Sequence, residues 1–326
     1  MPYHSPVLLE RSIELLKIDA HGSYADLTFG GGGHSRAILA QLGTEGHLYC
    51  FDRDIEAFTN LPQDSRIVPV HANYAHFARW LRYLNAPLLD GVILDLGVSS
   101  HHLDADTRGF SYRFDAPLDM RMNQQGNVTA SMLLASYEER ALAELFQTYG
   151  ELRNANKLAH AIVEERKVKP LTSTGQLAAL VERVYGRGGH LPKILACVFQ
   201  ALRIEVNAEL ESLERLLQQL PEFIKIGGRV VVLAYHSLED KLVKNYFRTG
   251  RCSGVAERDL FGNTVSPFAL LSKGVERARE EEQIENSRSR SARLRVGERV
   301  GSLKKAASMS PCRESHCFLY GTRRDE

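Results

Sequence analysis

Four consecutive glycines at residues 30–33 are the feature of this sequence best suited to hold a ligand. They lie between a β-prone run and a helical stretch that begins at His34. Glycine permits a backbone with positive φ and a close approach to a ligand, and the start of a helix offers N–H groups without partners. The cluster favours a nucleotide-type ligand, although a flexible turn would also be rich in glycine. No Lys-Ser/Thr pair follows, which disfavours the phosphate-binding loop of kinases and ATPases.

Two acidic residues stand where strands are predicted to end. Asp52 closes the second strand, where a carboxylate can accept hydrogen bonds from both ribose hydroxyls of either NAD or S-adenosylmethionine (SAM). Asp54 is better explained as the N-cap of the next helix. Asp95 closes the fourth strand and is followed by Leu-Gly-Val-Ser-Ser, at the point where the sheet should open to its ligand. An ordinary turn at the end of a strand is the alternative interpretation for Asp95.

A third group of polar residues follows the fifth predicted strand. His236, Glu239 and Asp240 should lie near the same opening of the sheet. In one interpretation, this position gives His236 a role on the substrate side of the site. In the alternative interpretation, Ser237 and the two acids cap and charge the first turn of the next helix.

Arginines offer contacts to an anionic partner. From residue 286 to the end the chain has ten Lys/Arg and four Asp/Glu, which suggests nucleic acid, although a solvated extension would look the same. Arg288, Arg290, Arg293 and Arg295 form a basic cluster. If this cluster is a strand, its first two arginines share one face and its last two share the other. Isolated arginines elsewhere are more often paired or solvated than bound to phosphate. These isolated arginines are Arg108, Arg121 and Arg203.

Strands and helices alternate over the first hundred residues. Continuous apolar strands separated by helices predict a parallel sheet that is covered on both faces, with its ligand at the carboxyl ends of the strands. Pro69 inside the third strand indicates either a frayed end of that strand or an edge position in the sheet. The predicted strands are 23–28, 47–52, 66–70, 90–95 and, much later, 229–234; the predicted helices include 34–42, 74–84 and 208–220.

The alternation is interrupted from about residue 106 to residue 207. This block has a helical pattern, with capping boxes predicted at Ser136–Glu139 and Ser173–Gln176. It looks like a helical domain inserted into an α/β parent. Residues 250–263 resemble a loop, and Met120 and Met122 are expected to be packing residues.

The composition is that of a globular protein with 326 residues, of which 44% are hydrophobic and 25% charged. No run approaches the ~18–20 apolar residues needed to cross a bilayer, and the first residues lack a secretory signal pattern. The five cysteines are scattered, and neither they nor the twelve histidines show the spacing of metal ligands. We therefore expect a soluble cytoplasmic protein with reduced thiols, no membrane partner and no metal centre.

Ten dispersed motifs make the assignment far more specific. In this order they resemble the bacterial 16S ribosomal RNA cytosine-N4 methyltransferases, the MraW or RsmH family. The motifs are Tyr3-His4 with Pro6-Val-Leu-Leu9, Thr28-Phe-Gly-Gly-Gly-Gly-His-Ser35, Asp95-Leu-Gly-Val-Ser-Ser100, Leu103-Asp104, Arg108-Gly-Phe-Ser111, Pro117-Leu-Asp-Met-Arg-Met122, Tyr149-Gly-Glu151, Phe199-Gln-Ala-Leu-Arg-Ile204 with Asn207 and Glu209-Leu210, His236-Ser-Leu-Glu-Asp240, and Ser287-Arg-Ser-Arg-Ser-Ala292 with Leu294-Arg-Val296.

The resemblance implies a class I, Rossmann-like α/β fold that binds SAM and methylates N4 of a cytidine in the decoding region of 16S rRNA. Residues 1–105 and 208–326 would form the SAM-binding domain, with residues 301–326 a tail of no assigned role. Residues 106–207 would form an inserted all-helical domain that recognises rRNA within the small ribosomal subunit. The cofactor would contact Gly32, Gly33, His34, Asp52, Tyr74, Asp95 and His102.

The chemistry needs the N4 amine to be held in line with the methyl donor and relieved of a proton. Asp95, or the backbone carbonyls that follow it, is the candidate acceptor, and His236 is a second catalytic candidate. Some positions depart from the family pattern: His102 replaces Gln, Leu152 replaces a second Glu, Tyr235 replaces Phe and Ser287 replaces Pro, and the run Lys193–Val198 replaces a more polar one. The alternatives are an NAD-linked oxidoreductase, a non-catalytic ribosome-assembly factor, and a SAM-dependent methyltransferase acting on another nucleic acid or a protein.

Overall fold

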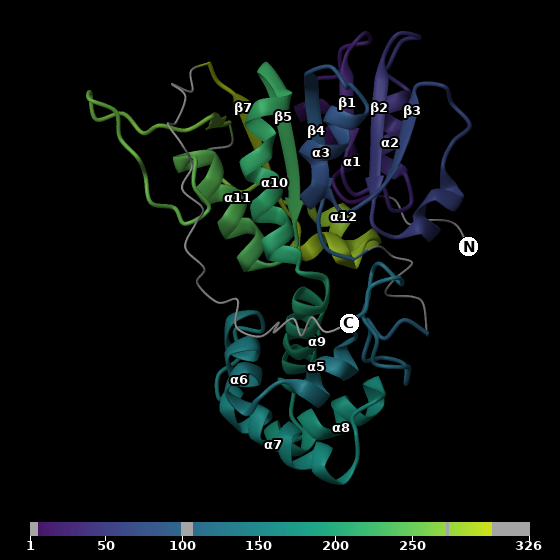
Figure 1. Ribbon diagram of the computed structural model, residues 1–326, viewed down its shortest axis with the longest axis vertical. Helices are drawn as coiled ribbons and strands as arrows, with labels where there is room; N and C mark the ends of the chain where they lie inside the picture. The colour runs from purple at the N-terminus through teal and green to yellow at the C-terminus, as the bar shows by residue number, and fades with distance from the viewer. Residues whose placement is uncertain (1–5, 99–106, 272–273, 302–326) are drawn as a thin grey trace, which may run out of the picture.

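A seven-stranded mixed sheet forms the centre of the computed structural model, which describes residues 6–98, 107–271 and 274–301 (Figure 1). The strand order is β3-β2-β1-β4-β5-β7-β6; β1 to β5 are parallel, and β7 is antiparallel to both of its neighbours. The α/β fold expected of a class I methyltransferase is confirmed, and of the two interpretations of Pro69 the edge position is confirmed. The strands are β1 (Ser23–Asp26), β2 (His47–Asp52), β3 (Ile67–His71), β4 (Leu89–Asp95), β5 (Ile224–Ala234), β6 (Phe268–Leu270) and β7 (Arg293–Arg299).

Helices cover both faces of the sheet, so alternate residues of the central strands enter two different cores. Val230 and Val232 of β5 pack with α3, α10 and α11, whereas Val231 and Leu233 pack with α1 and α2. Burial on both faces explains the continuous apolar runs in the sequence. These elements are α1 (Leu9–Leu16), α2 (Gly33–Leu39), η1 (Ile55–Asn60), η2 (Tyr74–His76), α3 (Phe77–Tyr83), α10 (Glu209–Phe223), α11 (Ser237–Thr249), α12 (Glu280–Glu285) and η3 (Ser287–Ser291), where η denotes a 3-10 helix.

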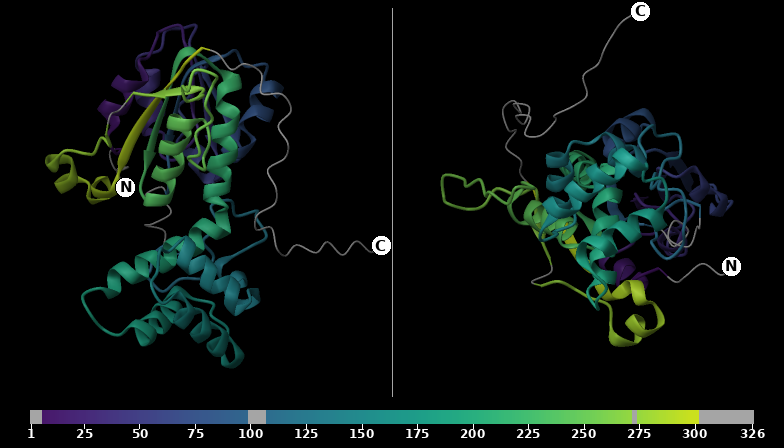
Figure 2. Two further views of the ribbon diagram at one scale, coloured as in Figure 1. Left: turned by 90° about the vertical axis from the view of Figure 1, so that its left-hand side faces the viewer. Right: turned by 90° about the horizontal axis from the view of Figure 1, so that it is seen from below.

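A separate layer of helices lies beyond the carboxyl ends of the parallel strands and is joined to the sheet layer where α9 is followed by α10 (Figures 1 and 2). It has its own apolar core, which includes Phe146, Leu158 and Leu202, as well as Met120 and Met122, the two methionines predicted to pack. Its helices are α5 (Ala130–Ser136), α6 (Glu139–Thr148), α7 (Ala155–Val168), α8 (Thr174–Tyr185) and α9 (Leu191–Asn207).

The expected helical block begins later than residue 106. Residues 107–129 contain no helix, and two of them, Gly109 (φ +72°) and Met120 (φ +63°), take left-handed conformations that a helix does not contain. At the other end, Ala208 (φ +47°) separates α9 from α10. The Asn207 side chain accepts a hydrogen bond from the N–H of Met122 and donates one to the carbonyl of Met120, and so ties the irregular segment to this junction.

One of the two predicted capping boxes is confirmed. Ser173 accepts a hydrogen bond from Gln176 N–H, and the Gln176 side chain accepts one from the backbone of Ser173. The box predicted at Ser136 is wrong, because Ser136 is the last residue of α5 and its hydroxyl donates to the carbonyl of Met132. A serine that bonds back into its own helix is not available to cap the next one.

Several boundaries also differ from the prediction. The helix predicted at 74–84 is a short 3-10 turn capped by Asn73 and followed by α3. The loop predicted at 250–263 is confirmed as a stretch without a helix or named strand. No helix of the described residues is both long and apolar enough to span a membrane. The tail from residue 302 onward lies outside the described residues.

Candidate active site

A cavity of about 550 Å³ opens at the carboxyl ends of the parallel strands. Segments that follow β1, β2, β3, β4 and β5 all contribute to its wall, and the helical layer adds Met122 and Arg203. This is the position at which open α/β sheets bind ligands, and the volume suits a nucleotide-sized one. Five of the predicted cofactor residues line it, namely Gly33, His34, Asp52, Tyr74 and Asp95.

The glycine loop is held in place by Asp52. One carboxylate oxygen of Asp52 accepts a hydrogen bond from Gly30 N–H at 2.8 Å, and the other accepts one from Asp54 N–H at 2.8 Å. Both oxygens thus take part in shaping the loops that follow β1 and β2 at the cavity. Gly32 is not in the cavity wall; it has φ +73°, and a Cβ there would lie 2.7 Å from Cζ of Phe29. Gly32 therefore shapes the loop, while its neighbours face the cavity.

Asp95 is held by two neighbours in the cavity wall. Its N–H donates to Oγ1 of Thr28 at 2.6 Å, and the hydroxyl of Tyr235 donates to its Oδ1 at 2.6 Å. Nδ1 of His34 lies 3.8 Å from Oδ2. Burial raises the pKa of Asp95 to about 7, although the hydrogen bond from Tyr235 opposes this shift. The carboxyl group can therefore gain or lose a proton near neutral pH.

His34 brings a buried polar atom to the same wall. Its Nε2 has no hydrogen-bond partner among the described residues. Burial lowers the pKa of His34, against the attraction of the nearby Asp26 carboxylate, and burial raises the pKa of Asp26. The imidazole is therefore neutral at physiological pH. A buried nitrogen without a partner in the described part of the chain, in a residue that lines a cavity, could be satisfied by a polar ligand such as SAM.

Tyr74 follows β3 in η2 and lines the cavity. The guanidinium of Arg53 lies over its ring, 5.8 Å from the centroid, and burial raises the pKa of its phenol. Its position after β3 is suited to an aromatic base. His102, the last predicted cofactor residue, lies outside the described residues.

His236 is the N-cap of α11. Its Nδ1 accepts a hydrogen bond from Glu239 N–H, and the Glu239 side chain accepts one from the backbone N–H of His236. The cap was predicted at Ser237, one residue too late. His236 is not among the residues that line the cavity, whereas Tyr235 and Glu239 are. The structure thus gives His236 a clear structural role beside the site.

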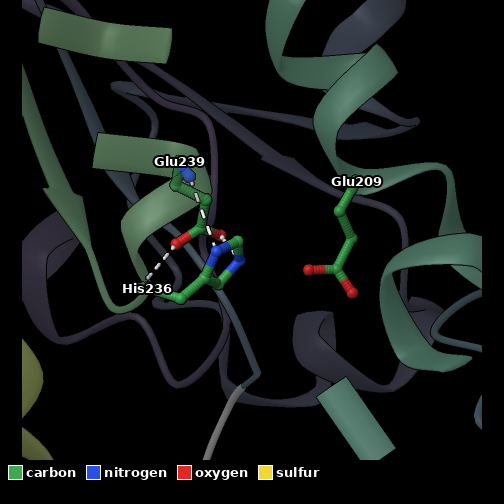
Figure 3. Close-up of side chains that lie close together, drawn as sticks. All are labelled: Glu209, His236 and Glu239. Carbon is green, nitrogen blue, oxygen red and sulfur yellow. Dashed lines mark hydrogen bonds and ion pairs between the residues drawn. The ribbon is translucent and has the colours of Figure 1, made fainter. Parts of the chain in front are cut away.

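Three side chains, those of Glu209, His236 and Glu239, lie close together (Figure 3). Their potential metal-ligand atoms are within 4.8 Å of one another. Nε2 of His236 lies 3.2 Å from Oε1 of Glu239, and Arg203 donates to both carboxylate oxygens of Glu209 at 2.8 and 3.0 Å. Despite burial, His236 and Arg203 lower the pKa of Glu239. Since a guanidinium already occupies Glu209, we interpret the group as an ion-pair cluster that joins α9 and α10 to α11. The prediction of no metal centre stays a prediction.

The isolated arginines are all paired. Arg108 contacts Asp54, which also caps η1 as predicted, and donates to the carbonyls of Arg121 and Met122. It therefore connects the β2 loop to the start of the helical layer. Arg121 pairs with Asp119, and Arg203 pairs with Glu209.

The four arginines of the cluster lie in two different elements and not, as was predicted, on the two faces of one strand. Arg293 and Arg295 lie in β7 and both pair with Asp240, with Arg295 buried. Arg288 and Arg290 lie in η3, where Arg288 lines the cavity and Arg290 is exposed. Only this second pair is placed to meet a ligand. Sequence reasoning missed Tyr235 and Glu209 as site residues; the position of Tyr235 at the end of β5 was the available signal.

Known proteins are similar to this chain over more than nine-tenths of its length. A relative from Phocaeicola vulgatus, named ribosomal RNA small subunit methyltransferase H, is 48% identical over 297 residues, which is 91% of this chain and 97% of that protein. One of the same name from Christiangramia forsetii is 46% identical over 300 residues, 92% of this chain and 99% of that protein. A solved rRNA methylase from Streptococcus thermophilus has 11% identity and a TM-score of 0.41 over 92% of this chain and 99% of its own, which is too low to carry an argument.

The sequence model of one protein family matches almost the whole chain. The model of the MraW methylase family matches residues 1–300, which include every strand and helix described above. This extent, together with the identity to the two relatives, establishes that the chain belongs to the MraW methylase family.

Proposed function

We propose that this protein transfers a methyl group from SAM to the exocyclic N4 of a cytidine in the decoding region of 16S rRNA. The observation that carries the proposal is the cavity at the switch point of the sheet, where the glycine loop, Asp52 and Asp95 converge. Membership of a methylase family and relatives named for small-subunit rRNA support the reaction and its substrate.

The chain's own residues suit SAM. The loop around Gly33 and His34 would hold the methionine end, Asp52 would accept hydrogen bonds from the ribose hydroxyls, and Tyr74 would lie against the adenine. The orphaned Nε2 of His34 supports this fit because a polar cofactor would supply its missing partner. SAM, when bound, supplies an electrophilic methyl group on a sulfonium.

Asp95 is the proposed catalytic residue. The N4 amine of cytosine is a poor nucleophile because its lone pair is delocalised into the ring, so the protein must hold the amine in line and accept its proton. Positioning of this kind supplies several kcal/mol, up to ~7–11 in ideal cases. A carboxylate whose pKa is about 7 can accept that proton near neutral pH. His236, the second catalytic candidate, we propose to act through its cap on α11, by positioning Tyr235 and Glu239.

The helical layer, predicted as an inserted domain over residues 106–207, is proposed to recognise the RNA. Met122 and Arg203 bring this layer to the cavity itself, so a base that enters the cavity must pass beside it. The target cytidine has to leave any stack to reach Asp95. We further propose that the substrate is rRNA within the small ribosomal subunit, and that the protein acts in the cytoplasm.

Methylation by the purified protein tests this proposal. Naked 16S rRNA and small subunits, both from cells that lack the gene, are incubated with SAM and analysed by nucleoside mass spectrometry after site-specific digestion. We expect N4-methylcytidine at one decoding-region position, with subunits the better substrate. Asp95→Asn should abolish the product, whereas Asp64→Asn, at the far end of β3, should not. Methylation only of DNA, of protein or of another rRNA position would refute the proposed substrate.

A further inference from the structure

We infer that Tyr235 is a positioning residue for Asp95: its hydroxyl occupies Oδ1 and leaves Oδ2 as the oxygen that receives the proton from the substrate amine. The inference rests on the proposed function, which it deepens by assigning separate roles to the two oxygens of one carboxylate.

The position of the Tyr235 ring is fixed from two sides. Its backbone N–H donates to Oε2 of Glu239 at 3.0 Å, within the capping arrangement at the start of α11. On the other side, the ring lies against the turn after β4, where a Cβ built on Gly97 would be 3.5 Å from Cδ2 of Tyr235. Gly97 has φ +95°, a conformation that glycine adopts without strain. The hydroxyl is thereby directed to Oδ1 of Asp95, at 2.6 Å.

The second carboxylate oxygen of Asp95, Oδ2, differs from Oδ1 in its hydrogen bonding. Among the described residues, Oδ2 accepts no hydrogen bond, and the closest recorded polar contact is Nδ1 of His34 at 3.8 Å. Both Asp95 and Tyr235 line the cavity. A substrate amine that enters the cavity would therefore find Oδ1 already engaged and Oδ2 open to it.

The step balances at this oxygen. As the N4–CH₃ bond forms, the S–CH₃ bond of the bound donor would break with its electron pair left on sulfur, so that S-adenosylhomocysteine is the leaving group. One N4–H bond breaks, its electron pair stays on N4, and the proton forms an O–H bond at Oδ2 before it passes to solvent as the product leaves. A hydroxyl that donates to Oδ1 stabilises the ionised carboxylate, which is the form that can accept the proton. Without that donor, burial acts unopposed and the carboxyl group holds its own proton to a higher pH.

Other charged groups face this carboxyl from each neighbouring element. They are Asp26 from β1, His34 from α2, Glu239 from α11 and, beside Tyr235, Arg288 from η3. Tyr235→Phe leaves all four in place and removes one hydroxyl, so a change in pH dependence reports on that hydroxyl.

The test compares the wild type, Tyr235→Phe and Tyr246→Phe. Tyr246 is the matched control, because it is a buried tyrosine that packs against Phe247 and Phe268 away from the cavity. Single-turnover methyl transfer is measured from pH 5.5 to 9.5 with saturating SAM. We expect the acid limb of Tyr235→Phe to shift upward by roughly one pH unit, with a rate at pH 9 within about threefold of wild type. Tyr246→Phe should follow the wild type.

A readout independent of activity separates this inference from the proposed function. The Asp95 carboxyl carbon is titrated by NMR in protein labelled with ¹³C-aspartate, and its resonance is assigned by its loss in Asp95→Asn. The expected midpoint is near pH 7 in wild type and higher by roughly one unit in Tyr235→Phe. Identical midpoints in the two proteins would overturn the inference. A wild type that transfers no methyl group to rRNA would instead refute the proposed function, whichever way the titration falls.

Discussion

Asp52 holds the glycine loop through Gly30 at the end of β2, and we propose that it also binds the ribose of SAM. Replacing it with alanine removes charged hydrogen bonds worth roughly 1.5–3 kcal/mol. We expect Asp52→Ala to raise the dissociation constant of SAM roughly ten- to hundredfold while the protein stays folded. Calorimetry of SAM binding and circular dichroism measure the two effects.

The matched control for this change is Glu45→Ala. Glu45 precedes β2 at the opposite end of the strand, and its side chain is 81% exposed, so its loss should leave SAM affinity unaltered. A folded Asp52→Ala protein that binds SAM as tightly as wild type would show that the cofactor pocket is placed wrongly.

The raised pKa of Asp95 should reduce the free energy of unfolding at a pH where the carboxyl group is ionised. Its pKa is about 7 in the folded protein and about 3.9 in an unfolded chain. For this raised pKa, the stabilising contribution of the neutral carboxyl is complete below about pH 4 and is lost as pH rises through about 7. Asp95→Asn stays neutral, so we expect it to exceed wild type in unfolding free energy at pH 8 by up to about 4 kcal/mol, with little difference at pH 4.

Urea denaturation at the two pH values measures this effect, and Asp64→Asn supplies a control of opposite sign. Arg66 lowers the pKa of Asp64 to about 2, so its ionised form stabilises the fold and its loss should not stabilise the protein at pH 8. An Asp95→Asn protein no more stable than wild type at pH 8 would contradict a raised pKa for this partly buried carboxyl group.

At the scale of elements, the start of α11 is capped by a histidine, which is not among the preferred N-cap residues. His236 caps this helix through a long hydrogen bond of 3.5 Å from Glu239 N–H. We expect His236→Ala to reduce the free energy of unfolding by about 0.5–1 kcal/mol, at the low end for a lost cap. His236→Asn should restore stability, since asparagine is a preferred N-cap.

The same pair of variants separates a cap from a catalytic group. If His236 acts through the helix, His236→Asn recovers methyl transfer together with stability. An asparagine variant with wild-type stability and a rate reduced more than tenfold would instead place His236 among the catalytic residues. Chemical denaturation and single-turnover rates on one preparation give both values.

At the scale of the whole molecule, the cavity lies where the sheet layer and the helical layer meet, and η3 presents Arg290 beside it. Neutralising one RNA phosphate contributes about 0.7–0.9 to the slope of log affinity against log salt. We therefore expect Arg290→Ala to weaken binding to small subunits and to flatten this slope by about that amount, without changing SAM affinity. Filter binding between 50 and 300 mM salt measures it.

Lys225→Ala is the control for loss of a positive charge. Lys225 pairs with Asp90 near the amino-terminal end of β5. The cavity lies at the other, carboxyl ends of the parallel strands. An equal effect of the two substitutions would mean that RNA responds only to net charge. An unchanged salt slope in Arg290→Ala would show that this arginine is merely solvated.

The features that could be predicted from the sequence are local ones. A buried strand is a continuous apolar run, so the five parallel strands were predicted correctly, and one of the two interpretations of Pro69, the edge position, is confirmed. The glycine loop, Asp52 and Asp95 follow from residue type at the end of a strand. Local rules failed where one side chain had two possible partners, since Ser136 bonds within α5 rather than capping α6.

Only the tertiary structure decided which distant charges pair. Arg295 belongs to a basic cluster that suggests RNA, yet it meets Asp240 across 55 residues and is buried; Arg108 meets Asp54 in the same way. The hydroxyl of Tyr235 reaches Asp95 across 140 residues. Secondary structure depends on neighbours up to about four residues away, which a sequence displays. A hydrogen bond between distant residues depends on how two elements pack to within tenths of an ångström. The sequence by itself therefore determined which strand ends carry the glycine loop, Asp52 and Asp95, and only the packing decided which side chains meet them in the cavity.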